Sequence, residues 1–106
     1  MSFRPVQDEV DAWISQFEEG YFLPLPMLAR LTEEVGELAR ALMHHYGGKT
    51  PKAGEARGDV GEEIADALFV LVCLANSLGI DLDARFTEMM QKYRTRDAER
   101  WTKKQI

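Results

Sequence analysis

The chain has 106 residues, of which 45% are hydrophobic and 29% charged, and its net charge at pH 7 is −5. This length fits one domain over residues 1–106, and the composition excludes an intrinsically disordered chain. The acidic balance argues against a nucleic-acid polymer as partner, because binding to a phosphate backbone relies on clustered lysine and arginine. A phosphorylated small molecule held through a metal ion is compatible with this balance.

The sequence predicts neither a membrane-spanning segment nor a disulfide of the kind found in oxidising compartments. No apolar leader follows Met1, and the longest nearly apolar stretch, residues 64–75, is too short to cross a bilayer. The single cysteine, Cys73, cannot form an intrachain disulfide. We therefore expect a cytoplasmic protein that does not contact membranes.

Helix-breaking glycines and prolines divide the chain into segments whose apolar residues recur at helical spacing, so we expect an all-α fold of four helices. The first helix is expected over about residues 7–19, ended by Gly20. The second is expected over about residues 26–46, with a proline in its first turn and Gly47-Gly48 after its end.

Two aspartates mark the starts of the remaining helices. Asp59 is a typical N-cap, and Glu62 three residues later completes a capping-box pattern. The third helix is therefore expected from Asp59 to about Leu78. The fourth is expected to start at Asp81. Its apolar residues lie along one side: Phe86, Met89, Met90 and Tyr93.

A loop over residues 47–58 joins the second and third expected helices. It contains four glycines and one proline, which is typical of a mobile connection. Three basic residues against one acidic residue distinguish it from the acidic remainder of the chain. A solvated connector is the simpler interpretation, and closure over a substrate through Lys49 and Lys52 is the alternative hypothesis.

Acidic residues occupy unusual places in both central helices. In the second, Glu34 and Glu37 lie three residues apart on the flank of the apolar stripe, and Glu33 precedes them. In the third, Asp66 is the one ionisable residue in an otherwise apolar stretch, and Glu63 lies one turn earlier. A helix that is apolar on all sides is expected to be buried on all sides, so the side with these two acids should be packed against another surface.

Carboxylates in such positions need a counterion. If the two helices are antiparallel, Glu34 and Glu37 can face Glu63 and Asp66, and four carboxylates would repel one another strongly. Oxygen ligands without His or Cys suit a hard cation, so Mg²⁺, or alternatively Mn²⁺, is preferred to Zn²⁺. The other interpretation is that the acids of the second helix are solvated, while Asp66 is paired with an arginine such as Arg30.

The acidic residues and their neighbours resemble the two-part signature of the MazG-type all-α nucleoside triphosphate pyrophosphohydrolases. The first part is LTEEVGEL at residues 31–38, and the second is EEIADALF at residues 62–69. The resemblance covers about residues 7–97, and it is strongest to the small, single-domain, YpjD-like branch of that family.

The resemblance implies a Mg²⁺-dependent hydrolase, working as a homodimer or homotetramer of helical chains. Such an enzyme splits a nucleoside triphosphate between its α and β phosphates into a monophosphate and pyrophosphate. Deoxynucleotides and non-canonical nucleotides are both candidate substrates, in a role of cleaning the nucleotide pool. Carried over by position, the resemblance implies metal ligands at Glu34, Glu37, Glu63 and Asp66. It gives Glu33 the role of orienting or deprotonating the attacking water.

Lys92 and Arg96 extend the resemblance, because similarly spaced residues of the family face the triphosphate. They lie four residues apart, on a side of the fourth helix expected to be opposite the apolar one. A solvated basic edge explains them equally well.

Asn76 is either a pocket group or a cap at the end of the third helix. The base is expected to stack on an aromatic side chain, and the candidates are Trp13, Phe17, Tyr21 and Phe22.

Two other functions fit parts of the pattern. A ferritin-like dinuclear iron bundle needs Glu-x-x-His pairs, and no glutamate here has a histidine three residues later. A helical dimerisation or adaptor module with an acidic binding face explains the net charge, but not Asp66 within an apolar stretch. We expect an oligomer, because the other three helices of one chain are amphipathic and cover the apolar third helix poorly.

Overall fold

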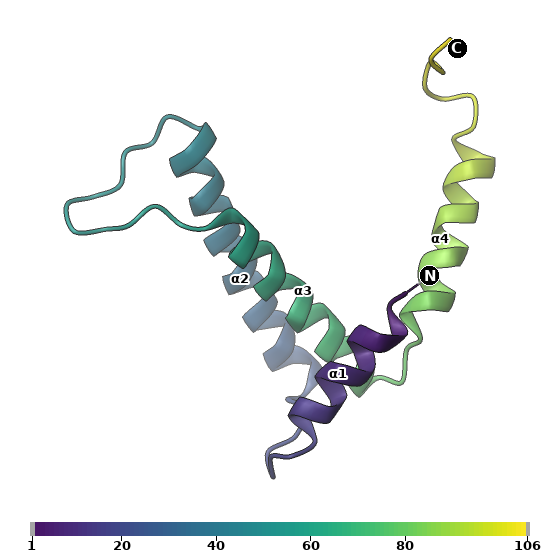
Figure 1. Cartoon of the computed structure of the whole chain (residues 1–106), viewed down its shortest axis with the longest axis horizontal. Coiled ribbons are helices and arrows are strands. Elements are labelled where there is room, and N and C mark those ends of the chain that lie inside the picture. The colour runs from purple at the N-terminus through teal and green to yellow at the C-terminus, as the bar shows by residue number, and fades with distance from the viewer. Residues whose placement is uncertain (1, 106) are drawn as a thin grey trace.

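The computed structural model describes residues 2–105, and these form four α-helices and no strand (Figure 1). The helices are α1 (Arg4–Ile14), α2 (Pro24–Tyr46), α3 (Val60–Ser77) and α4 (Leu82–Arg96). The all-α prediction is confirmed for this part of the chain. Of these helices, none is long and apolar enough to cross a membrane alone, and only α3 and α4 together, bent by 110° at their junction, reach the necessary length and hydropathy.

The ends of α1 and α2 differ by a few residues from the predicted ones. α1 spans Arg4–Ile14 rather than residues 7–19, because a proline suits its first turn and residues 15–19 form tight turns instead. α2 begins at Pro24, and Leu23 before it is extended. Both prolines of this segment therefore lie in the first turn, where the backbone N–H groups have no helical partner in any case.

The starts of α3 and α4 are as predicted, because local side-chain hydrogen bonds determine them. The Asp59 carboxylate accepts a hydrogen bond from the backbone N–H of Glu62 at 3.1 Å, and Asp81 accepts one from Asp83 at the same distance. Gly79, with a φ of 67°, takes the left-handed conformation that ends α3.

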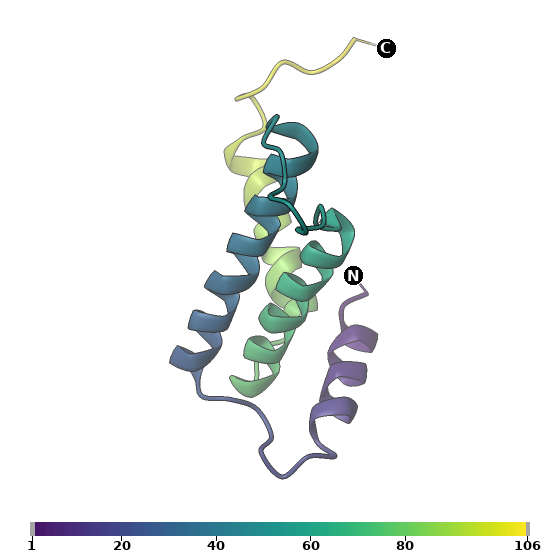
Figure 2. The ribbon, with the colours of Figure 1, turned by 90° about the vertical axis from the view of Figure 1, so that its left-hand side faces the viewer.

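α2 and α3 lie side by side and antiparallel, and α1 packs against α3 (Figures 1 and 2). The buried apolar residues come from α2 and α3: Met27, Ala41, Val70, Val72, Cys73 and Ala75. The loop between the two helices meets α2 at Gly58, where an added Cβ would lie 2.8 Å from the Cβ of Ala41. Only glycine permits so close an approach, so this contact determines where the loop returns to the helix pair.

A polar network joins α1 to the turn between α3 and α4. The Gln7 side chain is almost completely buried, and its amide nitrogen donates to Asn76 Oδ1 and to the Ile80 carbonyl, both at 2.9 Å. Its amide oxygen accepts from the backbone N–H of Leu82 at 3.0 Å. Asn76 in turn donates to the Gln7 carbonyl at 2.9 Å and to the Tyr21 hydroxyl at 3.0 Å. Buried polar groups that are paired in this way stabilise one arrangement of the three elements.

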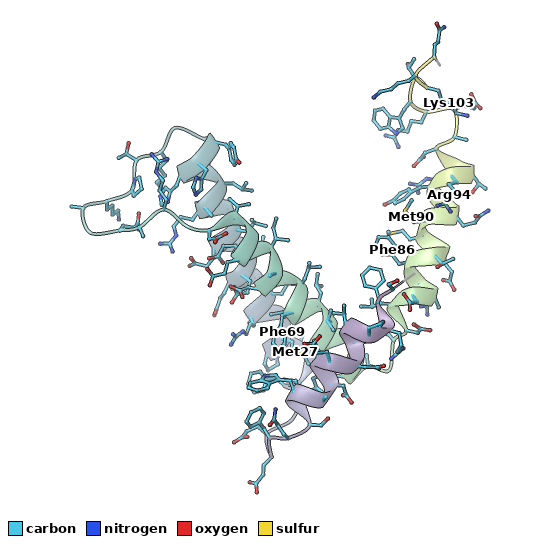
Figure 3. The ribbon with its side chains drawn as sticks, viewed as in Figure 1. Met27, Phe69, Phe86, Met90, Arg94 and Lys103 are labelled. Atoms are coloured by element: carbon cyan, nitrogen blue, oxygen red, sulfur yellow. The ribbon has the colours of Figure 1, made fainter. Side chains whose placement is uncertain are left out.

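α4 leaves this junction as the second arm of a V (Figure 1). Its base is held to α1, because Asp83 accepts hydrogen bonds from the backbone N–H groups of Phe3 at 2.7 Å and Arg4 at 3.2 Å. The rings of Phe3 and Phe86 also lie 5.1 Å apart. Beyond this base α4 stands away from α2 and α3, and Figure 3 shows Phe86 and Met90 on its inner side.

The expectation that α3 is enclosed on all sides is wrong for the single chain. Ile64, Leu68 and Leu71 are 45%, 51% and 44% exposed, because α1 and α2 cover only part of α3 and α4 points away. Asp66 is exposed and Glu63 is half-buried, so these acids lie on an open surface rather than a packed one. The poor cover of α3 by its own chain, in contrast, is as predicted.

Candidate functional site

Three carboxylates from two helices converge on one point of the surface. Glu34 of α2 and Glu63 and Asp66 of α3 each offer an oxygen, and these oxygens all lie within 4.8 Å of one another. Glu63 and Asp66 are three residues apart and share a side of α3, and the antiparallel pairing with α2 brings that side to Glu34. The structure thus brings together three of the four acids with proposed ligand roles, and we call them the carboxylate cluster.

The carboxylate cluster carries its negative charge without a basic partner. Among the described residues, none of its three members forms a salt bridge. Partial burial raises the pKa of Glu63, and the negative charges of Asp66, Glu37 and Glu34 raise it further. The unfavourable electrostatic energy of this arrangement is the kind that a bound cation relieves.

The other two acids of α2 lie outside the cluster. Glu37 follows Glu34 by one turn, but its carboxylate is paired with Arg40, whose Nη2 is 2.5 Å away. Glu33 is exposed beside Glu34. Glu37 therefore has to turn away from Arg40 before it can bind the same cation as the cluster.

The interpretation that pairs Asp66 with Arg30 is not what the structure shows. Within residues 2–105 these two side chains form no salt bridge. Arg30 instead lines a cavity next to the cluster, where it shares the lining with Cys73. Burial raises the pKa of the Cys73 thiol despite the nearby guanidinium of Arg30.

This cavity has a volume of about 170 Å³ and is largely apolar and aromatic. Its lining residues are Trp13, Ile14, Gly20, Tyr21, Phe22, Met27, Arg30, Phe69, Val70 and Cys73. Figure 3 shows Met27 and Phe69 together where the helices meet. Arg30 precedes Glu34 by one turn and Phe69 follows Asp66 by one turn. Residues of the cavity and of the carboxylate cluster therefore lie about one helical turn apart on both helices, roughly 4.5–6 Å along the helix axes.

Three of the four aromatic candidates line the cavity, and the fourth packs against one of them. Phe17 lies edge-on to Trp13, with ring centroids 5.0 Å apart and an interplanar angle of 75°. The Tyr21 hydroxyl donates to Asp11 at 2.7 Å and accepts from Asn76 at 3.0 Å. Burial and the hydrogen bond to Asp11 raise the pKa of Tyr21 to about 12. The Asn76 side chain thus hydrogen-bonds to Tyr21 and Gln7, and it lines a separate pocket between α1 and the turn after α3, not the aromatic cavity.

Part of this site could not be recognised in the sequence. Phe69, Val70 and Cys73 line the cavity, but as apolar residues of a helix they cannot be told from core residues in the sequence.

Lys92 and Arg96 lie on α4, on the other arm of the V (Figure 1). The prediction that they lie opposite the apolar side is wrong for Arg96, because its guanidinium lies over the Tyr93 ring, 5.4 Å from the centroid. Residues three apart on a helix are neighbours, and this spacing makes the contact possible. Arg96 also donates two hydrogen bonds of 3.1 Å to Asp97. Within one chain, neither basic residue is next to the carboxylate cluster.

The donor set of the cluster suits a hard divalent cation. Its three ligand groups are all carboxylates, and Mg²⁺ and Mn²⁺ prefer oxygen ligands. Two oxygens on one such ion lie about 3–4 Å apart, so small side-chain rotations bring the observed oxygens onto a common centre. Asp66 is exposed, which leaves room for water and for phosphate oxygens at the same ion.

Comparisons with known proteins identify the family of this chain. The family model of the MazG nucleotide pyrophosphohydrolase domain matches residues 22–101. The protein YpjD of Bacillus subtilis (strain 168) is 56% identical over 104 residues, which are 98% of this chain and 94% of YpjD. The crystal structure of YpjD from Bacillus subtilis matches with a TM-score of 0.81 at 55% identity, over 92% of this chain and 97% of that one.

A second solved structure is similar. The crystal structure of a Bacillus-conserved MazG protein, a nucleotide pyrophosphohydrolase, matches with a TM-score of 0.77 at 49% identity, over 92% of this chain and 94% of that one. The fold is thus that of helical nucleotide pyrophosphohydrolases. The chain belongs to the MazG family of nucleotide pyrophosphohydrolases, which confirms the resemblance seen in its sequence and sets it apart from adaptor modules.

Proposed function

We propose that this chain hydrolyses nucleoside triphosphates between the α and β phosphates, with Mg²⁺, to a nucleoside monophosphate and pyrophosphate. The observation that carries the proposal is the carboxylate cluster of Glu34, Glu63 and Asp66, which has no basic partner among the described residues. An acidic protein and a triphosphate repel each other, so a divalent cation between them is required for binding.

Each acid of the site has a proposed role. Glu34, Glu63 and Asp66 hold the Mg²⁺ ion, for which Mn²⁺ can substitute, and Glu37 is the proposed fourth ligand. When bound, the ion supplies neutralisation of phosphate charge and polarisation of the phosphoryl oxygens. Glu33 lies exposed beside Glu34, where it can orient a water and take its proton as the water attacks phosphorus. The bond to the bridging oxygen then breaks, and pyrophosphate leaves.

The aromatic cavity is the proposed site of the nucleoside base. Its volume of about 170 Å³ is small beside the roughly 300–1,000 Å³ of pockets that enclose whole ligands, so it fits one part of a nucleotide. Trp13, supported by Phe17, and Tyr21 offer ring faces or edges to a planar base. The cluster lies one helical turn away, which suits phosphates attached to a base in the cavity.

A second copy of the chain is the proposed source of the remaining positive charge. The exposed apolar residues of α3, with the apolar side of α4, support association into a homodimer or homotetramer. In such an assembly Lys92 and Arg96 of one copy can face the phosphates held by another. We place this activity in the cytoplasm, with deoxynucleotides or non-canonical nucleotides as the substrates to be removed from the pool.

The test is incubation with a panel of normal, deoxy- and modified nucleoside triphosphates in Mg²⁺ or in EDTA. The proposal predicts monophosphate and pyrophosphate in equal amounts, formed only with the metal. Release of orthophosphate and a diphosphate would contradict the cleavage position. Equal activity in EDTA would contradict the role of the cluster.

A further inference from the structure

Arg40 connects an acid of the proposed site to the loop between α2 and α3. Its Nη2 lies 2.5 Å from Glu37 Oε2, and its Nη1 lies 3.3 Å from Glu55 Oε2. Glu37 precedes Arg40 by one turn of α2, whereas Glu55 belongs to the loop. One guanidinium is therefore shared between a proposed metal ligand and an acid that has no place in the site.

The loop holds Glu55 in position for this contact. The other carboxylate oxygen, Glu55 Oε1, accepts a hydrogen bond from the backbone N–H of Lys52 at 3.2 Å. The same oxygen lies 3.5 Å from Nε2 of His44, whose side chain is almost fully buried. The Lys52 hydrogen bond and the charge of Arg40 lower the pKa of Glu55, so it is an anion throughout the neutral range. Arg40 thus always has a second anionic partner at hand.

Glu37 is the one proposed ligand that stands outside the carboxylate cluster. It acts on the cluster at a distance, since its negative charge contributes to raising the pKa of Glu63. A fourth carboxylate turned into the cluster would add to this repulsion as long as no cation is bound. The ion pair with Arg40 removes that cost by neutralising Glu37 outside the cluster.

We propose that Arg40 is a positioning residue that holds Glu37 out of the carboxylate cluster when no cation is bound, and whose charge transfers from two acids to Glu55 alone when Glu37 turns to the cation. The proposal rests on the proposed function, because it takes the cluster as the Mg²⁺ site. Glu55 lowers the cost of this transfer, since Arg40 keeps an anionic partner after Glu37 has left. The loop thereby tunes Mg²⁺ affinity without contacting the ion.

Two substitutions have opposite expected effects on Mg²⁺ binding. Arg40→Gln frees Glu37 and removes a positive charge near the site, so MgCl₂ should bind on the order of threefold more tightly. Glu55→Gln leaves Glu37 as the only partner of Arg40, so binding should weaken by a similar factor, on the order of threefold. Arg40→Lys retains the charge and should restore affinity close to that of the wild type. A purely structural role for Arg40 would weaken binding in both Arg40 variants.

The decisive experiment is a double-mutant cycle measured by calorimetric titration of MgCl₂ into the full chain. If Glu55 acts through Arg40, then Glu55→Gln has no effect in the Arg40→Gln background, and the double variant binds like Arg40→Gln alone. Arg57→Gln, which removes another positive charge, serves as the control for a general charge effect. Equal effects of Glu55→Gln with and without Arg40, or tighter binding in Arg57→Gln to the same degree, would overturn the proposal. A wild-type chain that binds no MgCl₂ would instead overturn the proposed function on which it rests.

Discussion

Glu34 of α2 and Asp66 of α3 each place a carboxylate oxygen within 4.8 Å of the other and of Glu63. Neither side chain has a basic neighbour that neutralises it among the described residues. The helices are held in this arrangement by their apolar contact and not by the acids, because like charges at such distances repel. The contact between α2 and α3 therefore pre-organises the proposed cation site, at the cost of electrostatic repulsion among its carboxylates.

Replacing Asp66 by asparagine separates the chemistry of the site from its folding. Asp66 is exposed, so Asp66→Asn should change the free energy of unfolding by no more than about 0.5 kcal/mol. Pyrophosphate release should fall by about 100-fold or more, because a proposed ligand loses its charge. Both quantities are measured on one preparation, by urea unfolding and by a pyrophosphate assay.

Glu62→Gln is the matched control for this substitution. Glu62 lies on the same helix next to Glu63 and is exposed, but it is not a member of the cluster. We expect it to retain activity within a few-fold of the wild type. Full activity in Asp66→Asn, or an equal loss in the two variants, would contradict the ligand assignment.

The raised pKa of Glu63 predicts how the metal-free protein responds to acid. An isolated glutamate titrates near 4.5, and partial burial followed by the neighbouring carboxylates raises the pKa of Glu63 above this value. Because the pKa of Glu63 is higher in the folded chain than in the unfolded chain, protonation of this side chain favours folding. This contribution to stability is complete below pH 4.5 and is lost as the pH rises through the folded-state pKa. In EDTA, the Tm should therefore rise as the pH is lowered from neutrality toward 4.5.

This pH effect has an internal control and a sign reversal. Glu63→Gln should flatten the rise, because its side chain does not titrate. Glu55 and Asp97 have lowered pKa values, so their stabilising contributions are lost only in more acidic solution. With Mg²⁺ present the trend should invert, since protons compete with the ion for Glu63. Identical pH profiles for wild type and Glu63→Gln in EDTA would contradict the account.

Removing the Trp13 ring tests the cavity as the base site. Trp13 is 55% exposed and lines the cavity, so Trp13→Ala should alter substrate binding more than the fold. We expect KM to rise about tenfold, since loss of an aromatic stack costs roughly 1–1.5 kcal/mol, with little change in kcat. Trp101→Ala, which removes the other tryptophan, 72% exposed and outside the cavity, is the control. A loss confined to kcat would argue against base binding in the cavity.

Gln7 is expected to be a large contributor to stability. Gln7→Leu leaves the Ile80 carbonyl and the Leu82 N–H without their partner and breaks the bond to Asn76. The expected loss in the free energy of unfolding is about 2–4 kcal/mol, measured by urea denaturation. Gln16→Leu, on an exposed glutamine in the turn after α1, should cost less than about 0.5 kcal/mol. Similar losses in the two variants would contradict the importance of the buried network.

The features that could be predicted from the sequence are those determined by neighbouring residues. The caps at Asp59 and Asp81 depend on a side chain and an N–H a few residues away, so α3 and α4 start where predicted. The cross-helix approach of the acids follows from antiparallel pairing of the two helices, which the loop over residues 47–58 permits. The end of α1 was missed, because residues 15–19 have helical spacing but form tight turns before the proline of α2.

The features that could not be predicted depend on contacts between distant residues. The direction of α4 follows from Asp83 and Phe86 meeting the start of α1, a contact that no local pattern encodes. The burial of Gln7 likewise depends on Asn76, far along the chain. The exposure of Asp66 was mispredicted for a related reason, because an apolar stretch shows that a helix needs cover but not whether its own chain provides it.

The central claim is that acids from two helices form one divalent-cation site, and a Mn²⁺ titration followed by electron paramagnetic resonance tests it most directly. We predict saturable Mn²⁺ binding that Mg²⁺ displaces, and at least tenfold weaker binding in both Glu34→Gln, on α2, and Asp66→Asn, on α3, while Glu62→Gln binds like the wild type. Mn²⁺ affinity unchanged by either cluster substitution would contradict the claim.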